Sequence, residues 1–535
     1  MSATLVAKDL AGGHAHRTLF EHLDLTVAPG DVVGVVGANG AGKSTLLRLL
    51  AGEDLPLGGT VTTAPSDAFV GWLPQEHERV PGETVADHIG RRTGATAATV
   101  AMEEAAAGLG GDDPKADEAY AVALDHWLVS GAPDLDDRIP PMLAELGLDV
   151  GPDALMTSLS GGQAARAALA ALLLSRFDLV LLDEPSNDLD LAGLDRLEAF
   201  VHGQRGGVVL VSHDRALLRE VGEEFLDLDP SEDGRPRTYA GGYQGWQEGR
   251  RRDRERWEQD YAAQQEEHRR LQDSVSAARD RLSTGWRPPK GTGKHQRQTR
   301  APGLVRSFNR DLAALEAHRI SVPEPPMSLR FPELSSDAVS TLLRCEGVRV
   351  PGRLSGPVSF ALDGGERLVV TGPNGAGKST LLQVLGGVLP PSEGSVWTAS
   401  GARVALVGQE EPEWTPGLTA ADVYFQHCGH LVAAGVVAER EIPSLRSTGL
   451  VDAEARRTPA ARLSQGQQRR LELALRLASL PQLLILDEPT NHLSAGLVDE
   501  LTAALRATPA AVVVATHDRQ MLDDLADWPT LALGK

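Results

Sequence analysis

The sequence predicts an α/β protein in which two similar parallel-sheet domains flank a long antiparallel helical hairpin. Four stretches of the first half recur, in the same order, in the second half. Within each half, apolar β-rich runs alternate with amphipathic helical segments, a pattern typical of parallel sheets covered by helices. Between the halves, residues 243–283 are strongly charged and contain no proline, which favours one long helix.

The internal repeat defines the domain organisation. "GVVGANGAGKSTLLRLLAG" (34–52) recurs as "VVTGPNGAGKSTLLQVLGG" (369–387), and "LVLLDEPSNDLD" (179–190) recurs as "LLILDEPTNHLS" (483–494). The offset is 335 residues at the first pair of motifs and 304 at the second, so the first half carries about 30 further residues. We place them near 108–117, in a solvated loop between helices. The predicted domains are residues 1–239 and 331–535, with a linker at 240–330.

Composition narrows the class of protein. A chain of 535 residues exceeds what one hydrophobic core supports. The two cysteines, Cys345 and Cys428, are too few for a disulfide framework, a cysteine zinc site or an iron–sulfur cluster. No apolar run reaches the length of a membrane span, and the N-terminus lacks a signal-peptide pattern. These features predict a cytoplasmic protein with neither a membrane segment nor a metal cluster.

A glycine-rich phosphate-binding motif precedes a predicted helix in each half. Its glycines let successive backbone N–H groups point at phosphate oxygens, next to the positive end of the helix dipole. Lys43 and Lys378 are expected to neutralise the β and γ phosphates of ATP. The nucleotide-binding residues predicted from the two motifs are Gly37, Asn39, Gly40, Gly42, Lys43, Ser44 and Thr45, and Gly372, Asn374, Gly375, Gly377, Lys378, Ser379 and Thr380.

Carboxylates close the next apolar strand of each half. Asp183 and Asp487 end these runs, and the glutamate that follows each of them can activate a water molecule as general base. A histidine after a further strand can contact the γ-phosphate as a neutral imidazole, and a glutamine about 31 residues after the motif lysine can sense the metal. The predicted catalytic residues are Glu184, Glu488, His213, His517, Gln75 and Gln409. The predicted Mg²⁺ ligands are Ser44, Gln75, Asp183, Ser379, Gln409 and Asp487.

With these companions, the chain resembles the ATP-binding-cassette ATPases. "LSGGQ" and "LSQGQ" are similar to the signature stretch of that superfamily. The resemblance implies that the two cassettes pair within one monomer, so that each signature caps the nucleotide held by the other cassette's lysine. The signature residues are Ser160, Gly161, Gly162 and Gln163, and Ser464, Gly466 and Gln467. Gln465, Ser494 and Asp188 depart from the superfamily pattern, which predicts unequal hydrolysis at the two sites.

The charged segment at 240–330 is predicted to be a helical arm with a basic tip. Residues 240–330 hold 18 cations and 12 acids, although the whole chain has a net charge of −22. Tyr261, His268, Val275 and Leu282 recur every seven residues with Gln264, Leu271 and Ala278 between them, and a return helix has a matching seam at Val305, Phe308, Leu312 and Leu315. Residues 281–310 carry eight cations and no acid, which favours a polyphosphate partner over a merely solvated linker. The predicted RNA-binding residues are Arg281, Trp286, Arg287, Lys290, Lys294, His295, Arg297, Arg300, Arg306 and Arg310.

Tandem cassettes joined by such a linker resemble the ABC-F family, and "TYAGGYQGW" (238–246) is similar to the stretch that enters its linker. The resemblance implies an ATPase that binds the ribosome through large-subunit RNA or a tRNA. It favours a protein that confers antibiotic resistance by displacing drugs from the large subunit. A housekeeping translation factor is the first alternative. The fused ATPase subunit of a membrane transporter is the second, and the basic linker argues against it.

Overall fold

The structure is a computed structural model of the whole chain. It describes residues 3–534 except 15–16, 67, 75–78, 110–114, 187–188, 190, 284–304, 307, 311, 314–321, 326–327, 335–340, 374, 410–411, 413 and 492. The described residues divide into two compact units. The first contains both repeats, called here the first cassette (β1 to β9) and the second cassette (β10 to β17). The second contains most of the segment between them.

The first cassette is built on a six-stranded sheet of order β5-β6-β7-β3-β8-β9, parallel except for the β8–β9 pair. A three-stranded antiparallel sheet, β2-β1-β4, packs beside it. The strands are β1 (Thr4–His14), β2 (Arg17–Val27), β3 (Val32–Val36), β4 (Gly58–Ala64), β5 (Val70–Leu73), β6 (Leu179–Asp183), β7 (Gly207–Val211), β8 (Glu224–Asp227) and β9 (Arg237–Ala240). The helices are α1 (Lys43–Leu50), α2 (Val85–Arg92), α3 (Ala95–Ala107), α4 (Ala116–Val129), α5 (Leu135–Glu145), α6 (Gly161–Leu174), α7 (Leu191–Gly203) and α8 (Arg215–Val221).

The central strands are apolar throughout because both faces of their sheet are covered. Every residue of β3, β6 and β7 is buried. Val180 and Val208 belong to the core packed under α2, α5, α6 and α7, whereas Leu181 and Val209 belong to the core shared with β1, β2 and α1. A parallel sheet enclosed in this way accounts for the continuous apolar runs of the sequence.

The second cassette repeats this architecture. Its main sheet, β14-β15-β16-β12-β17, is parallel throughout, and a three-stranded antiparallel sheet has the order β11-β10-β13. The strands are β10 (Leu343–Val350), β11 (Leu354–Leu362), β12 (Arg367–Thr371), β13 (Glu393–Thr398), β14 (Val404–Val407), β15 (Leu483–Asp487), β16 (Ala511–Ala515) and β17 (Thr530–Ala532). The helices are α11 (Lys378–Leu385), α12 (Ala420–Ala433), α13 (Ala453–Arg457), α14 (Gln465–Ala478), α15 (Ala495–Ala507) and α16 (Arg519–Asp524). The predicted fold class is confirmed.

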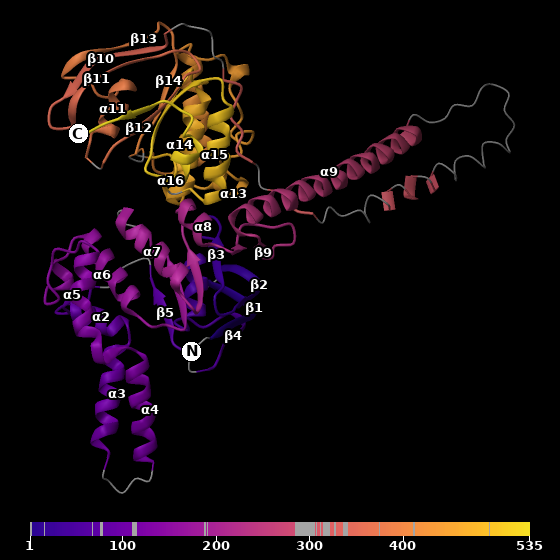
Figure 1. Cartoon of the computed structure of the whole chain (residues 1–535). Helices are drawn as coiled ribbons and strands as arrows, with labels where there is room; N and C mark the ends of the chain where they lie inside the picture. Colours follow the sequence, from indigo (N-terminus) through magenta and orange to yellow (C-terminus); the bar gives the residue numbers. More distant parts are fainter. Residues whose placement is uncertain are drawn as a thin grey trace, which may run out of the picture. The chain divides into compact units, whose positions relative to one another are not determined.

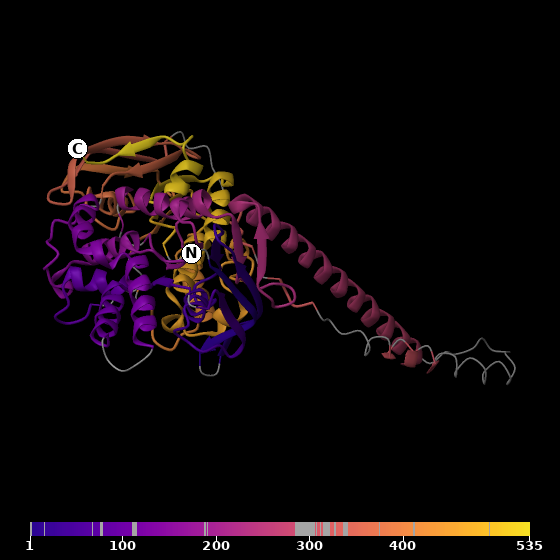
Figure 2. The same cartoon turned by 60° about the horizontal axis from the view of Figure 1, so that its bottom comes forward.

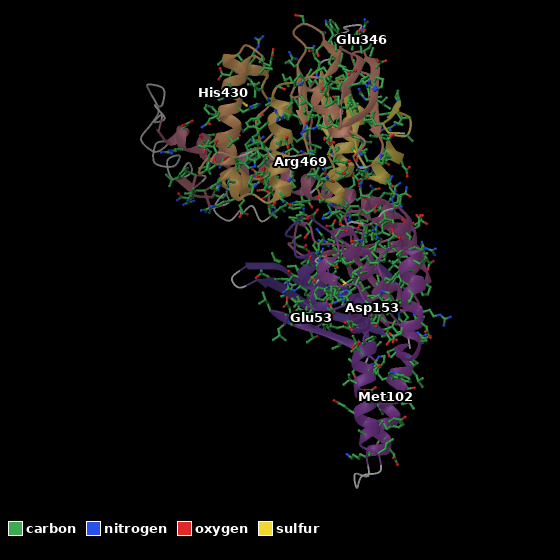
Figure 3. The ribbon with its side chains drawn as sticks, turned by 90° about the vertical axis from the view of Figure 1, so that its left-hand side faces the viewer. Glu53, Met102, Asp153, Glu346, His430 and Arg469 are labelled. Carbon is green, nitrogen blue, oxygen red and sulfur yellow. The ribbon has the colours of Figure 1, made fainter. Side chains whose placement is uncertain are left out.

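The extra residues of the first half form more than a loop. Helices α3 and α4 pack against each other as a hairpin that projects from the first cassette (Figure 1). Met102 marks this hairpin in Figure 3. The predicted loop near 108–117 joins the two helices, and Trp127 of α4 donates to the hydroxyl of Thr99 on α3 with a 3.0 Å Nε1–Oγ1 distance. Alanine-rich sequence makes both helices favourable, since alanine has the highest helix propensity.

The segment between the cassettes begins with α9 (Gly242–Ser283), one continuous helix of 42 residues (Figure 2). Tyr261, His268 and Leu271 are less exposed than their neighbours, as the predicted seam requires, and Ala278 is buried. The return segment contacts the helix, because Trp257 donates its indole N–H to the Pro323 carbonyl at 2.8 Å. Residues 305–306, 308–310 and 312–313 are helical, and Leu315 lies outside the described residues.

No helix in the described part of the chain is long and apolar enough to cross a membrane. Among the same residues, no group of three or more histidine, cysteine or acidic side chains is arranged to hold a metal ion. The two cysteines, Cys345 and Cys428, are both free thiols.

Candidate nucleotide-binding sites

Both glycine-rich motifs form the loop that the sequence predicts between a strand and a helix. In the first cassette, Gly37, Gly40 and Gly42 all have positive φ angles, so the backbone curls between β3 and α1 in a way that other residues resist. The ammonium group of Lys43 folds back and donates to the carbonyl of Gly37 at 2.8 Å. Lys378 makes the same contact with Gly372 at 2.8 Å. Thus each loop holds a buried lysine at its mouth.

The predicted general bases stand in a strained backbone conformation. Glu184 and Glu488 follow β6 and β15 directly and have φ angles of 51° and 47°. Non-glycine residues avoid this left-handed region, and its use is often tied to function. The backbone N–H of Glu184 donates to Val211 O of β7 at 2.9 Å, and that of Glu488 donates to Ala515 O of β16 at 2.8 Å. The neighbouring strand therefore fixes each turn.

Each glutamate is linked to the predicted histidine of its own cassette. The backbone N–H of His213 donates to Glu184 Oε2 at 2.9 Å, and His213 Nε2 lies 3.3 Å from Glu184 Oε1. The second cassette has the same pair, with 3.0 Å from the His517 backbone nitrogen to Glu488 Oε2 and 3.3 Å between the side chains. In addition, His517 Nε2 lies 2.9 Å from Lys378 Nζ. A neutral imidazole can accept a hydrogen bond from the lysine ammonium there, and burial and the lysine charge both lower the pKa of His517.

Burial raises the pKa values of the carboxyl groups at these sites. It raises the pKa of Glu184 to about 7 and that of Glu488 to about 7. A general base with a pKa near the working pH combines a useful unprotonated fraction with a useful proton affinity. Burial also raises the pKa of Asp183 and of Asp487. By contrast, it lowers the pKa of both lysines.

The aspartates fit a divalent cation. Asp183 Oδ1 and Asp487 Oδ1 are buried and have no hydrogen-bond partner within the described residues. A buried oxygen without a partner is costly unless a ligand completes it. Ser379 donates its hydroxyl to Gln409 Oε1 at 3.4 Å, so this predicted metal ligand lies beside the loop. Hard oxygen donors of this kind are the ligands that Mg²⁺ prefers.

The two signature stretches begin helices α6 and α14. Ser160 is the N-cap of α6, and its backbone N–H donates to Gln163 Oε1 at 2.9 Å. Ser464 is the N-cap of α14 and makes the same contact with Gln467 at 3.0 Å. Such capping boxes fix the helix start, while the dipole of a helix N-terminus favours an anion. Gly161, Gly162 and Gly466 lie in the first turns of these helices.

A cleft of about 2320 Å³ contains residues of both phosphate-binding loops. Its lining includes Lys43 and Lys378, the two predicted general bases and the two predicted histidines. Gln465, which departs from the signature pattern, also lines the cleft. Further predicted ligands that line it include Asn39, Ser44, Asp183, Ser379 and Gln409. The structure thus brings the motifs of the two cassettes to one cavity.

Some predicted residues lie outside the described part of the chain. These are Gln75, Asn374 and the tip residues Trp286, Arg287, Lys290, Lys294, His295, Arg297 and Arg300. The backbone of Arg281 belongs to the last turn of α9. Arg306 and Arg310 are described and exposed.

Sequence reasoning missed several arginines around these sites. Arg353 lines the cleft, and its planar guanidinium offers a surface on which a nucleotide base can stack. Arg215 and Arg519 each follow a catalytic histidine by two positions and pair with acids of the other cassette. The internal repeat could have identified this pair, because Arg215 and Arg519 occupy equivalent positions in it. Arg469 lies buried among the helices of the second cassette (Figure 3) and has no counterpart, since the equivalent position is Ala165.

Comparisons with known proteins agree with this architecture. The "ABC transporter" family model matches residues 20–187 and 356–491. The tylosin resistance ATP-binding protein TlrC of Streptomyces fradiae is 38% identical over 529 residues, covering 94% of this chain and 93% of the relative. The energy-dependent translational throttle protein EttA of Mycobacterium tuberculosis is 31% identical, covering 96% of this chain and 89% of the relative.

Solved structures support the fold. The RNase-L inhibitor covers 99% of this chain and 88% of its own length, at 18% identity and a TM-score of 0.54. The archaeal ribosome recycling factor aABCE1, in complex with the ribosomal stalk protein aP1, covers 98% of this chain and 88% of its own length at 18% identity and a TM-score of 0.55. At this identity the likeness bears on the fold only.

Proposed function

The chain belongs to the ABC-F family of tandem ATP-binding-cassette proteins, and from this premise we propose that it is a ribosome-binding ATPase that protects translation from a drug acting on the large subunit. The observation that carries the proposal is the 38% identity to a tylosin resistance protein along 94% of the chain. Similarity of that extent includes the linker and both cassettes.

We propose hydrolysis at two sites, one in each cassette. Lys43 and Lys378 neutralise the phosphates, and Glu184 and Glu488 accept a proton from the attacking water. The side chains of His213 and His517, held by their glutamates at 3.3 Å, contact the γ-phosphate as neutral imidazoles. The nucleotide in each site is capped by the signature helix of the other cassette, and the presence of Gln465 in the shared cleft supports this pairing.

Mg²⁺ completes each site in this proposal. Asp183, Ser44 and Gln75 hold it in the first cassette. Asp487, Ser379 and Gln409 hold it in the second, where the buried Asp487 Oδ1 lacks a partner among the described residues. When bound, the ion supplies positive charge that offsets the charge of the β and γ phosphates.

The proposed domain boundaries are 1–239, 240–330 and 331–535, and the linker carries the RNA contact. Residues 281–310 hold eight cations and no acid on a chain of net charge −22, and Arg306 and Arg310 among them are exposed. Such a charge distribution directs a polyphosphate to the tip. Large-subunit RNA or a bound tRNA is the proposed partner.

A housekeeping translation factor is the second candidate. It is favoured by the 31% identity to a translational throttle protein over 96% of the chain. Both candidates require ribosome binding, so they differ in phenotype rather than in mechanics. The fused ATPase of a membrane transporter is a third candidate with a different partner.

Co-sedimentation tests the ribosome proposal. E184Q/E488Q, which retains ATP without hydrolysing it, should pellet with 70S ribosomes, whereas K43A/K378A should stay in the supernatant with ATP present. Pelleting with membranes instead would favour the transporter. Failure of the double glutamine variant to pellet would end the ribosome proposal.

Growth of a sensitive host across a panel of ribosome inhibitors then separates the first two candidates. Expression of the wild type should raise the inhibitory concentration of tylosin or another large-subunit drug, and K43A/K378A should not. Unchanged sensitivity across the panel, together with ribosome binding in vitro, would favour the translation factor.

A further inference from the structure

Two equivalent arginines, each two residues after a predicted catalytic histidine, form ion pairs with acids of the opposite cassette. Arg215 and Arg519 are related by the 304-residue repeat, and each follows the sequence His-Asp. Both cassettes belong to one compact unit. The side chain of Arg215 has no solvent exposure, although a buried arginine is stable only when it is paired.

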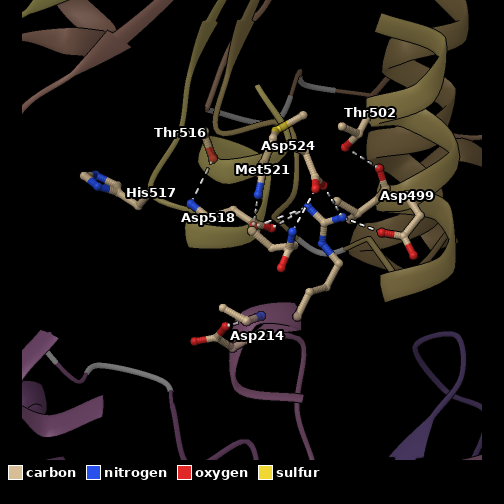
Figure 4. Close-up of polar contacts among 12 residues, drawn as sticks. Asp214, Asp499, Thr502, Thr516, His517, Asp518, Met521 and Asp524 are labelled. Carbon is tan, nitrogen blue, oxygen red and sulfur yellow. Dashed lines mark hydrogen bonds and ion pairs between the residues drawn. The ribbon is translucent and has the colours of Figure 1, made fainter. Parts of the chain in front are cut away.

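Arg215 of the first cassette ends among three carboxylates of the second cassette. Its guanidinium bonds to Asp499 Oδ1, lies 3.3 Å from Asp518 Oδ1 and lies 3.5 Å from Asp524 Oδ2. Figure 4 shows Asp499, Asp518 and Asp524 turned toward the same point. Asp518 directly follows His517 and also caps α16, since its Oδ1 accepts from the Met521 N–H at 2.8 Å. The position of His517 is therefore tied to an arginine of the other cassette.

Arg519 makes the reciprocal crossing. Its Nη2 lies 2.9 Å from Glu198 Oε1 and 3.2 Å from Asp214 Oδ2, both in the first cassette. Asp214 directly follows His213 and caps α8 through bonds from Ala216 N and Leu217 N at 3.0 and 3.1 Å. This crossing is weaker than the first, because the Arg519 side chain is 25% exposed and has two acidic partners rather than three.

Asp499, one of the partners of Arg215, also bonds to the start of the linker helix. Asp499 Oδ2 accepts a hydrogen bond from the hydroxyl of Tyr243, in the first turn of α9, at 3.1 Å. The Tyr243 ring packs against Phe225 and Trp246, with centroid distances of 5.7 and 5.0 Å. One carboxylate thus joins the second cassette to the Arg215 side chain and to the first turn of the linker helix.

We propose that Arg215 and Arg519 are positioning residues that act across the cassette interface, Arg215 on the site of His517 and Arg519 on the site of His213. This inference rests on the proposed hydrolysis at two sites. Loss of Arg215 would leave three carboxylates facing one another without their cation, and their repulsion would displace Asp518 and the adjoining histidine. The histidine of the first cassette would keep its own anchor, Arg519.

The test measures each site separately in the full-length protein. E184Q confines turnover to the site of Glu488, and E488Q confines it to the site of Glu184. In the E184Q background, R215A should lower kcat about tenfold while KM for ATP changes less than about threefold, because the group acts on geometry rather than on binding. In the E488Q background, R215A should lower kcat less than about twofold. R519A should show the opposite preference, with a smaller loss.

Matched variants separate positioning from stability. R196A removes an exposed pair with Glu145 at 2.6 Å and should change neither site. R519E should lose activity, and R519E/E198R should recover it by restoring an arginine beside Asp214. R215K keeps the charge and should fall between the wild type and R215A if the alanine variant proves unstable.

The outcomes are distinguishable. Equal losses from R215A in the two backgrounds, or a loss below twofold in E184Q, overturn the crossed assignment. If instead E184Q/E488Q hydrolyses ATP as fast as the wild type, the proposed general bases are wrong before any arginine variant is compared.

Discussion

Arg469 and Glu472 form a buried ion pair on α14, with 2.8 Å between Nη1 and Oε2. The guanidinium also bonds to the carbonyl of Gly408, the neighbour of the predicted Mg²⁺ ligand Gln409, and donates to the carbonyl of Asp487 at 2.8 Å. The equivalent residues of the first cassette are Ala165 and Ala168. The second cassette therefore has a buried ion pair behind its strand ends at two positions where the first cassette has alanines.

Removing Arg469 from this buried ion pair should destabilise the second cassette. R469A leaves Glu472 buried without its cation and should cost about 3–5 kcal/mol, whereas R469A/E472A, which copies the first cassette, should cost less. Urea unfolding of both variants measures the difference. Equal losses would mean that Glu472 finds water or another partner when the arginine is removed.

The buried glutamates predict a pH dependence of stability. Burial raises the pKa of Glu184 and of Glu488 from 4.5 to about 7, so the folded protein binds more protons than the unfolded chain between these values. Their contribution is fully present below pH 4.5 and is lost as the pH rises through about 7. At pH 8 without nucleotide, E184Q/E488Q should be about 1–3 kcal/mol more stable per site than the wild type, an advantage that shrinks at pH 5.5. Thermal melts at both pH values provide the measurement, and a pH-independent difference would contradict the assigned pKa values.

The basic tip should control ribosome affinity through charge. R306E/R310E should weaken ribosome binding and flatten its dependence on salt, because each lost phosphate contact removes about one unit of the slope. R344E/R349E makes the same charge change at exposed residues of β10 and is the control. Binding across a salt series measures both. If the two variants behave alike, net charge rather than the tip determines affinity.

Gln465 should weaken ATP binding at the site that contains Lys43. It lines the cleft at the first position of α14, where the superfamily pattern has glycine. In the E488Q background, Q465G should lower KM for ATP about two- to fivefold by removing a side chain from the phosphate region. Q465A removes the same side chain without the backbone freedom of glycine, so it is the control and should lower KM in the same way. No change in KM for Q465G would place its side chain outside the nucleotide contact.

Local patterns in the sequence were enough to predict the secondary structure and the motifs of each nucleotide-binding site. Glycines at positions that need positive φ, acids at strand ends and a seven-residue seam along α9 are local patterns, and local patterns survive in a linear sequence. Lys43, Glu184 and their counterparts could therefore be named before the fold was known. The helical hairpin of α3 and α4 was only partly anticipated, because its alanine-rich helices show little amphipathic contrast.

The pairing of the buried charges, by contrast, could be identified from the three-dimensional structure alone. Arg215 and Asp518 are 303 residues apart, and Arg519 and Asp214 are 305 apart. Nothing in the neighbouring sequence marks such partners, because a buried ion pair depends on long-range packing rather than on periodicity. The contacts of Arg469 could not be predicted from the sequence either, because two of its acceptors are backbone carbonyls, which every residue possesses.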